Sequence, residues 1–114
     1  MPEKRSIGIL ALPGPCCKQM QHLGEHIRLA RMRRKIRQND MAKRICIAVK
    51  TYRKIENGDP AIAIGLYLSA LYMLGLHSDF SLLASPERDR IGLMHEEMRL
   101  PKRVRLAKDK ELDF

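Results

Sequence analysis

Aromatic residues are scarce in this chain of 114 residues. Tryptophan is absent, and the aromatic residues together make up 4% of the sequence. Aromatic side chains bury the largest apolar areas in protein cores, so this core must depend on aliphatic residues and on the seven methionines. A chain of this length has room for one domain with appended segments, but not for two independent cores.

Long apolar runs are also missing. No stretch approaches the roughly 20 residues that a helix needs to cross a bilayer. The apolar segment 7–12 follows Lys4 and Arg5, but it is too short for a signal peptide and is ended by Pro13-Gly14-Pro15. We therefore expect a cytoplasmic protein with no membrane partner.

The cysteines do not suggest a disulfide framework. There are three, an odd number, and Cys16 and Cys17 are adjacent. Together with His22 and His26, which share a helix face, they could be assembled into a zinc site. Adjacent cysteines are poor chelators, however, so we predict free thiols, no bound metal and no cofactor.

Catalytic patterns are equally sparse. The sequence contains no pairing of a nucleophile with a base and no glycine-rich loop that could hold a phosphate. The adjacent carboxylates of Glu96 and Glu97 would point to different sides of a helix. We predict that the protein is not an enzyme.

Positive charge is present and concentrated. The net charge of the whole chain is +9, whereas the segment 28–54 holds eleven basic residues and a single acid, Asp40. The rest of the chain is therefore close to neutral. Concentrated basic charge is typical of a surface that contacts nucleic-acid phosphates.

The same segment shows a helical pattern interrupted by a short break. Met41, Ala42 and Ile45 share one face of a first helix, and Tyr52 and Ile55 share one face of a second. The opposite face of the second helix is left free to enter a DNA major groove. Asn57-Gly58 is expected to end that helix, since glycine readily adopts the left-handed conformation found at helix ends. This pattern predicts a helix-turn-helix.

Four blocks between residues 22 and 76 resemble the Cro/cI-type (XRE) helix-turn-helix family. They are Leu23-Gly24-Glu25-His26-Ile27-Arg28, Gln38-Asn39-Asp40-Met41-Ala42, Ile55-Glu56-Asn57-Gly58 and the apolar stretch from Ile64 to Leu74. The resemblance implies an all-α fold: a lambda-repressor-like bundle of about five short helices that binds double-stranded DNA.

The resemblance also implies roles for individual residues. Base-reading positions in this family correspond to Val49, Lys50 and Lys54, with Thr51 as a further contact. Lysine suits guanine and valine suits a thymine methyl group. Contacts to the DNA backbone are expected from Arg37, Gln38, Lys43, Arg44 and Arg53, of which Gln38 resembles the family's phosphate-binding glutamine. The resemblance further implies an ion pair between Arg31 and Glu56 that joins the first helix to the end of the recognition helix.

Three positions depart from the family pattern. Cys46 replaces the usual glycine of the turn, Ala48 replaces the cap of the recognition helix, and Arg37 replaces the cap of the helix before it. An absent cap costs on the order of 1 kcal/mol. These departures predict a marginal or partner-stabilised domain, or one that has lost tight DNA binding.

The apolar stretch after the motif has two apolar faces. Ile64, Tyr67, Leu68, Leu71 and Leu74 form the expected core stripe, while Leu66, Ala70 and Met73 form a second one. A helix that is apolar on two faces must bury both. We expect this region to form a homodimer, and the alternative is that a later helix covers it.

The predicted organisation has four parts. Residues 1–20 form an arm without helical periodicity, residues 21–84 the DNA-binding bundle, residues 85–100 a C-terminal helix and residues 101–114 a basic, flexible tail. Ser85-Pro86-Glu87 has the composition of a helix start, and Pro101 ends that helix.

The tail resembles that of HipB-like antitoxins, the DNA-binding partners of HipA-type kinase toxins. A basic segment that ends in Leu112 and Phe114 could dock through these two apolar anchors. We therefore predict a transcriptional repressor, the antitoxin of a type II toxin–antitoxin operon that represses its own promoter. The alternatives are a stand-alone XRE regulator, or a toxin-binding protein that has lost DNA binding.

Overall fold

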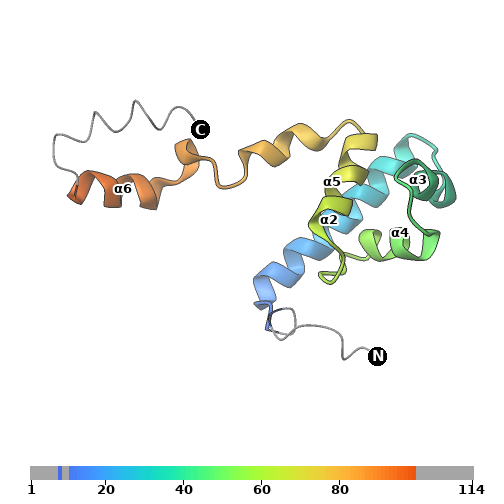
Figure 1. Cartoon of the computed structure of the whole chain (residues 1–114), viewed down its shortest axis with the longest axis horizontal. Helices are drawn as coiled ribbons and strands as arrows, with labels where there is room; N and C mark the ends of the chain where they lie inside the picture. Colours follow the sequence, from blue (N-terminus) through green and yellow to red (C-terminus); the bar gives the residue numbers. More distant parts are fainter. Residues whose placement is uncertain (1–7, 9–10, 100–114) are drawn as a thin grey trace. The chain divides into compact units, whose positions relative to one another are not determined.

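The computed structural model describes residue 8 and residues 11–99. Within these residues all regular structure is helical and no strand occurs, so the predicted all-α class is confirmed (Figure 1). The α-helices are α2 (Gly14–Arg33), α3 (Gln38–Arg44), α4 (Val49–Glu56), α5 (Ile64–Met73) and α6 (Arg90–Arg99). Two 3-10 helices, η2 (His77–Leu82) and η3 (Pro86–Arg88), lie between α5 and α6.

The chain divides into two compact units, Met1–Phe80 and Ser81–Phe114. The first unit contains α2 to α5, and its helices enclose one core. α3 packs against α4 and α5, and α4 also packs against α2. The buried apolar residues come from all four helices and from the residue that follows α5: Ile27, Ala30, Met41, Ala42, Tyr52, Ile55, Tyr67, Ala70 and Leu74.

Packing holds the two short helices in place. α3 has 7 residues and α4 has 8, and helices shorter than about 12 to 15 residues are marginal in water on their own. Met41, Tyr52 and Ile55 are completely buried, as the helical pattern predicts. Burying side chains of this size contributes roughly 1.5–3 kcal/mol each, so tertiary contacts are what stabilise α3 and α4.

The structure corrects the predicted extent of the N-terminal arm. α2 begins at Gly14, so residues 14–20 are helical rather than part of an irregular arm. Proline is tolerated in a first helical turn because its missing N–H would have no partner there. Pro13 precedes the helix, and its carbonyl oxygen accepts hydrogen bonds from the N–H groups of Cys16 and Cys17 at 2.9 and 3.0 Å. The prolines therefore mark a helix start.

α2 and the end of α4 meet through two glycines. A Cβ atom on Gly24, in the middle of α2, would lie 2.5 Å from the carbonyl oxygen of Glu56 and 2.7 Å from the backbone nitrogen of Gly58. Gly58 follows α4 with φ +73° and lies against the backbone of Met20. Asn57-Gly58 thus ends α4 as predicted, and it also gives α2 a close backbone contact.

Tyr67 in α5 and Leu74 just after it are buried as predicted, but the rest of the inner face of α5 differs from the prediction. Ile64 was expected in the core stripe but is 65% exposed, whereas Ala70, expected in the outer stripe, is completely buried. The buried positions are Tyr67, Ala70 and Leu74, and the Tyr67 hydroxyl donates a 2.7 Å hydrogen bond to the carbonyl oxygen of Asp59. A helix that is apolar all round does not reveal its inner face through periodicity.

The second unit begins its helix later than the sequence predicts. The Ser85 side chain makes no capping hydrogen bond, and the residues after it form η3 rather than the first turn of α6. Asp89 takes the capping role, because its Oδ1 accepts a 2.9 Å hydrogen bond from the Gly92 N–H. α6 then runs to Arg99. Leu112, Phe114 and the rest of the predicted tail lie outside the described residues.

Candidate nucleic-acid interface

The turn between α3 and α4 carries a conformational cost. Cys46 has φ +60° and is exposed, and the left-handed conformation costs roughly 1–2 kcal/mol for a residue with a Cβ atom. Arg37 and Ala48 occupy the N-cap positions of α3 and α4, and neither makes a capping hydrogen bond through its side chain. Ile47 helps to close the turn by donating a 3.0 Å hydrogen bond to the carbonyl oxygen of Ala42.

α4 has one buried face and one basic face. Tyr52, Ile55 and Glu56 are buried, while Lys50, Arg53 and Lys54 are exposed. Lys50 and Lys54 lie four residues apart and therefore share one side of the helix. The free face of α4 consequently holds three cations and no acid.

Two of the predicted base-reading residues are less free than expected. Val49 is half-buried and packs against the core, and Thr51 is also half-buried. The base-reading role that the resemblance implies would need Val49 on the open face of α4, but Val49 is the first residue of this helix and packs against the core. Lys50 and Lys54 are the exposed members of the predicted base-reading set.

Most of the predicted backbone-contacting residues are exposed around this face. They are Arg37, Lys43, Arg44 and Arg53. Arg37 is 79% exposed, with its Nε atom 3.9 Å from Oδ2 of Asp40. Exposed pairs of this kind contribute at most about 1 kcal/mol, so Arg37 can leave Asp40 at little cost.

A buried ion pair joins α2 to the end of α4, the helix that carries the basic face. Arg31 Nε donates to Oε2 of Glu56 at 2.6 Å and its Nη2 donates to Oε1 at 3.1 Å, while its Nη1 donates to the carbonyl oxygen of Ile36 at 2.9 Å. The two side chains are 12% and 3% exposed. This is the pair that the family resemblance implies. Its bidentate geometry fixes α2 relative to the end of α4.

The same carboxylate has an altered acidity. Burial alone would raise the pKa of Glu56, but its interactions with Arg31, with the Tyr52 hydroxyl and with Gln38 together outweigh burial, so the pKa lies below its ordinary value of 4.5. Glu56 is therefore ionised at neutral pH and accepts hydrogen bonds from both Arg31 and Gln38.

The side chain of Gln38 makes two hydrogen bonds that the sequence did not predict. Its Nε2 donates a 2.9 Å hydrogen bond to Oε1 of Glu56, and its Oε1 accepts a 3.3 Å hydrogen bond from Nε of Arg53. The phosphate contact that the resemblance implies for Gln38 stays a prediction, and within the protein its side chain links α3 to two residues of α4. Sequence spacing gave no sign of this link, because Gln38 lies 18 residues from Glu56.

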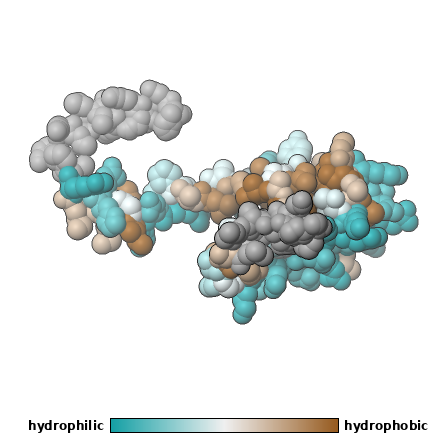
Figure 2. Space-filling model, turned by 60° about the horizontal axis from the view of Figure 1, so that its bottom comes forward, coloured by the Kyte–Doolittle hydropathy of each residue, from teal (hydrophilic) through white to brown (hydrophobic). Residues whose placement is uncertain are grey.

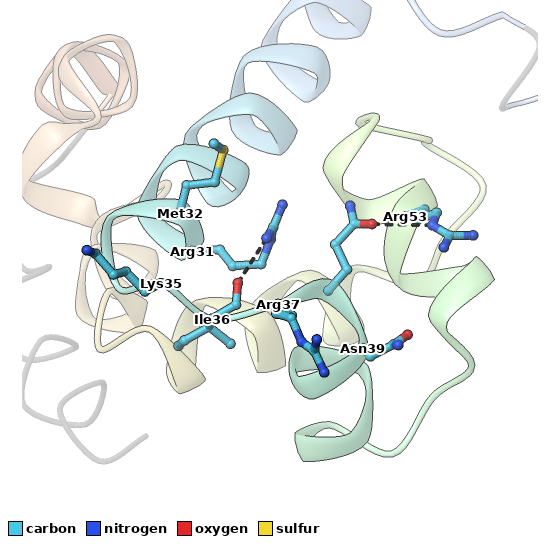
Figure 3. A pocket seen from close by; sticks show the side chains of 8 residues that line it. Arg31, Met32, Lys35, Ile36, Arg37, Asn39 and Arg53 are labelled. Carbon is cyan, nitrogen blue, oxygen red and sulfur yellow. Dashed lines mark hydrogen bonds between the residues drawn. The ribbon is translucent and has the colours of Figure 1, made fainter.

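An open hollow of about 560 Å³ lies beside this link (Figure 3). The side chains that line it come from the end of α2, the following loop, α3 and α4: Arg31, Met32, Lys35, Ile36, Arg37, Gln38, Asn39 and Arg53. Every charged side chain in this lining is basic. Figure 3 shows the Arg53 side chain extending from α4 towards the oxygen that accepts its hydrogen bond, which belongs to Gln38. Arg37 and Asn39 lie beside α3.

The cysteines and histidines show no arrangement typical of a metal site. The rings of His22 and His26 stack with their centroids 6.4 Å apart, and Cys16 and Cys17 are half-buried free thiols. Among the described residues, no group of three or more potential ligands comes together. No helix in the described ranges is long and apolar enough to cross a membrane.

Comparison with known families identifies the region just described. A family model for the helix-turn-helix matches residues 27–66, which extend from the second half of α2 to the start of α5. Residues 27–66 form a helix-turn-helix domain. In this domain α3 and α4 are the two helices of the motif, and α4 holds the recognition position. Neither curated proteins nor solved structures give a match.

The matched motif is one that DNA-binding proteins place in a major groove. Residues 27–66 contain all eleven basic residues of the segment 28–54, including the cations exposed on α4. Exposed basic charge and the second helix of the matched motif therefore both fall on α4.

Proposed function

We propose that the protein is a sequence-specific transcriptional repressor whose helix α4 enters the major groove of its operator. The observation that carries this proposal is the exposure of Lys50, Arg53 and Lys54 on the side of α4 opposite its buried residues. A helix held by its apolar face and charged on its outer face has the form required for reading DNA.

The proposed contacts divide into two groups. Lys50 and Lys54 would donate hydrogen bonds to guanine O6 and N7, and Thr51 and Val49 would contact a thymine methyl group if the groove approaches the start of α4 closely. Arg37, Lys43, Arg44 and Arg53 would neutralise phosphates and set the position of the domain on the duplex. A half-site containing guanine and thymine is expected.

The salt dependence of binding tests this proposal. Binding to a labelled fragment of the gene's own promoter is measured across a range of salt concentrations. With about six to ten phosphates neutralised by a dimer, log K should fall against log salt with a slope of roughly −0.9 per phosphate. A slope near zero would contradict DNA binding, and it would favour a protein that retains only a partner-binding role.

We also propose that the protein acts as a homodimer through α5. Ile64 and Tyr72 are 65% and 63% exposed, and Leu76, just beyond the helix, is 44% exposed. Figure 2 shows apolar side chains, in brown, gathered over part of the bundle beside strongly hydrophilic surface. A second copy would cover this apolar face and place two recognition helices on one duplex. Sedimentation of a variant with Ile64→Asp and Tyr72→Asp should report a monomer where the parent chain is a dimer.

An antitoxin role is the more specific form of this proposal. Apart from the tail resemblance, it is supported by α6, where Ile91, Met94 and Met98 are 68%, 58% and 74% exposed. These three residues recur at helical spacing and form an apolar stripe that a partner could cover. The partner would be a HipA-type kinase toxin, and a kinase-like reading frame next to this gene would support it.

Truncation after Leu100 separates the two activities. The truncated chain retains α2 to α6 and should still shift promoter DNA. If Leu112 and Phe114 anchor the toxin, it should fail to bind or neutralise the toxin. Unchanged neutralisation would exclude the tail as the toxin interface, and a stand-alone regulator would show no toxin binding with either chain.

A further inference from the structure

Four side chains form a continuous polar chain from the core to the basic face. Arg31 binds Glu56 through two hydrogen bonds, Glu56 accepts a third from Gln38, and Gln38 accepts one from Arg53. Arg31 and Glu56 are almost fully buried, Gln38 is half-buried and Arg53 is exposed. The chain thus begins at a rigid pair and ends at a cation on the free face of α4.

The chemistry of Glu56 dictates how Gln38 is oriented. An ionised carboxylate can only accept hydrogen bonds, so the Gln38 amide must turn its NH₂ group towards Glu56. Its carbonyl oxygen then has to point the other way, where it meets Nε of Arg53 at 3.3 Å. Reversing the amide would place oxygen against oxygen at one end and N–H against N–H at the other.

Among the described residues, this orientation leaves the end of the Arg53 guanidinium without a hydrogen-bond partner. Only the Nε of Arg53 bonds to Gln38, while the N–H groups of Nη1 and Nη2 are the fork that binds a phosphate through two parallel hydrogen bonds. An arginine side chain loses considerable rotamer freedom when it binds. A neighbour that already holds its Nε reduces that loss.

We infer that Gln38 is a positioning residue for DNA binding: it holds Arg53 in the orientation that contacts a backbone phosphate, and Glu56 and Arg31 in turn hold Gln38. The inference rests on the proposed DNA-binding function. It assigns Gln38 an indirect role, because the phosphate contact is made by Arg53.

The test uses the fact that Gln38 is uncharged. Replacing a neutral side chain that itself touches a phosphate weakens binding without changing the number of counterions released. If Gln38 acts through Arg53, Gln38→Ala should lower the salt slope of promoter binding by about 0.9 for each phosphate that Arg53 no longer neutralises. Arg53→Ala should lower it equally, and the double variant should be no worse than Arg53→Ala alone.

Asn39→Ala is the matched control, because it removes another neutral amide that lines the same hollow; its slope should equal that of the parent chain. Thermal unfolding of each variant checks that the domain is folded. If Gln38→Ala unfolds, Gln38→Met keeps the length of the side chain without its polar atoms and is measured in its place.

The outcomes are distinct. A lowered slope for the Gln38 variant, together with non-additivity with Arg53→Ala, supports the inference. A steep parental slope that the Gln38 variant leaves unchanged, or effects that simply add, overturns it and leaves the proposed function standing. A flat slope for the parent chain overturns both.

Discussion

Gly24 and Glu56 bring the backbones of α2 and α4 into direct contact, since a Cβ atom on Gly24 would lie 2.5 Å from the Glu56 carbonyl oxygen. Gly24→Ala should therefore destabilise the domain by about 1–3 kcal/mol, as overpacking does, although alanine is the better helix former. Urea unfolding followed by circular dichroism measures the change.

Gly65 supplies the matched control. It lies within α5, and a Cβ atom there would meet nothing within 4 Å. Gly65→Ala should stabilise the domain by up to about 1 kcal/mol through helix propensity alone. Stabilisation by Gly24→Ala, with the same sign as that expected for Gly65→Ala, would contradict the close packing of α2 against α4.

Glu56→Gln should destabilise the protein in a manner that depends on pH. At neutral pH the substitution leaves the buried guanidinium of Arg31 without its counter-charge, which costs about 3 kcal/mol or more. The folded-state pKa of Glu56 lies below 4.5, so its contribution is present above 4.5 and is lost as the pH falls through the folded-state value. The difference in unfolding free energy between parent and variant should narrow as the pH is lowered from neutral to below 4.5.

Glu25→Gln tests whether this effect is specific to the buried pair. Glu25 pairs with Arg28 at 3.1 Å, but the two side chains are 52% and 43% exposed. Its removal should change the free energy of unfolding by less than about 1 kcal/mol. A difference between parent and Glu56→Gln that stays constant with pH would rule out the ionised pair as its source.

Cys46→Gly should stabilise the domain by about 1 kcal/mol, because glycine adopts the φ of +60° found at Cys46 without steric strain. Part of the gain is offset by the greater freedom of glycine in the unfolded chain. Cys46→Ala removes the thiol but keeps the Cβ atom, so it should give no such gain. Equal midpoints of denaturation for the two variants would contradict the strain.

Lys54→Ala should weaken operator binding by about 1–3 kcal/mol and relax the base preference at one position of the half-site. Affinities for operator and random duplexes, measured at one salt concentration, show whether the loss is specific. Lys18→Ala makes the same charge change on an exposed part of α2 outside residues 27–66 and should affect neither duplex. Equal losses on both duplexes for Lys54→Ala would make Lys54 a phosphate contact.

Sequence patterns predict this fold best where a helix has two different faces. Tyr52 and Ile55 recur at helical spacing and alternate with lysine and arginine, so both the helix and its buried face could be inferred. α5 has no polar face, and the choice between Ile64 and Ala70 for the core depended on packing that periodicity does not encode. The start of α6 could not be predicted either. Ser85 and Asp89 are both good capping residues, but Pro86–Arg88 form a 3-10 helix, so Asp89 is the residue that caps α6.

The sequence predicted which residues make up the candidate interface, but not the contacts that their side chains make with one another. The cations around α4 follow from the sequence, since exposed lysine and arginine need no partner. The half-buried state of Val49 and the bond between Gln38 and Arg53 depend on how α3 and α4 meet. Contacts between residues many positions apart arise from tertiary packing, so a reading of local spacing could not supply them.

The length of α2 has a consequence for the order of folding. Among the described helices, α2, with 20 residues, is long enough to be populated before any tertiary contact forms. The bond from Arg31 to Glu56 closes a loop of 25 residues and is expected to form late. Glu56→Gln should then accelerate unfolding more than it slows folding in stopped-flow kinetics. The buried ion pair would set how long the folded domain lasts, rather than how quickly it is reached.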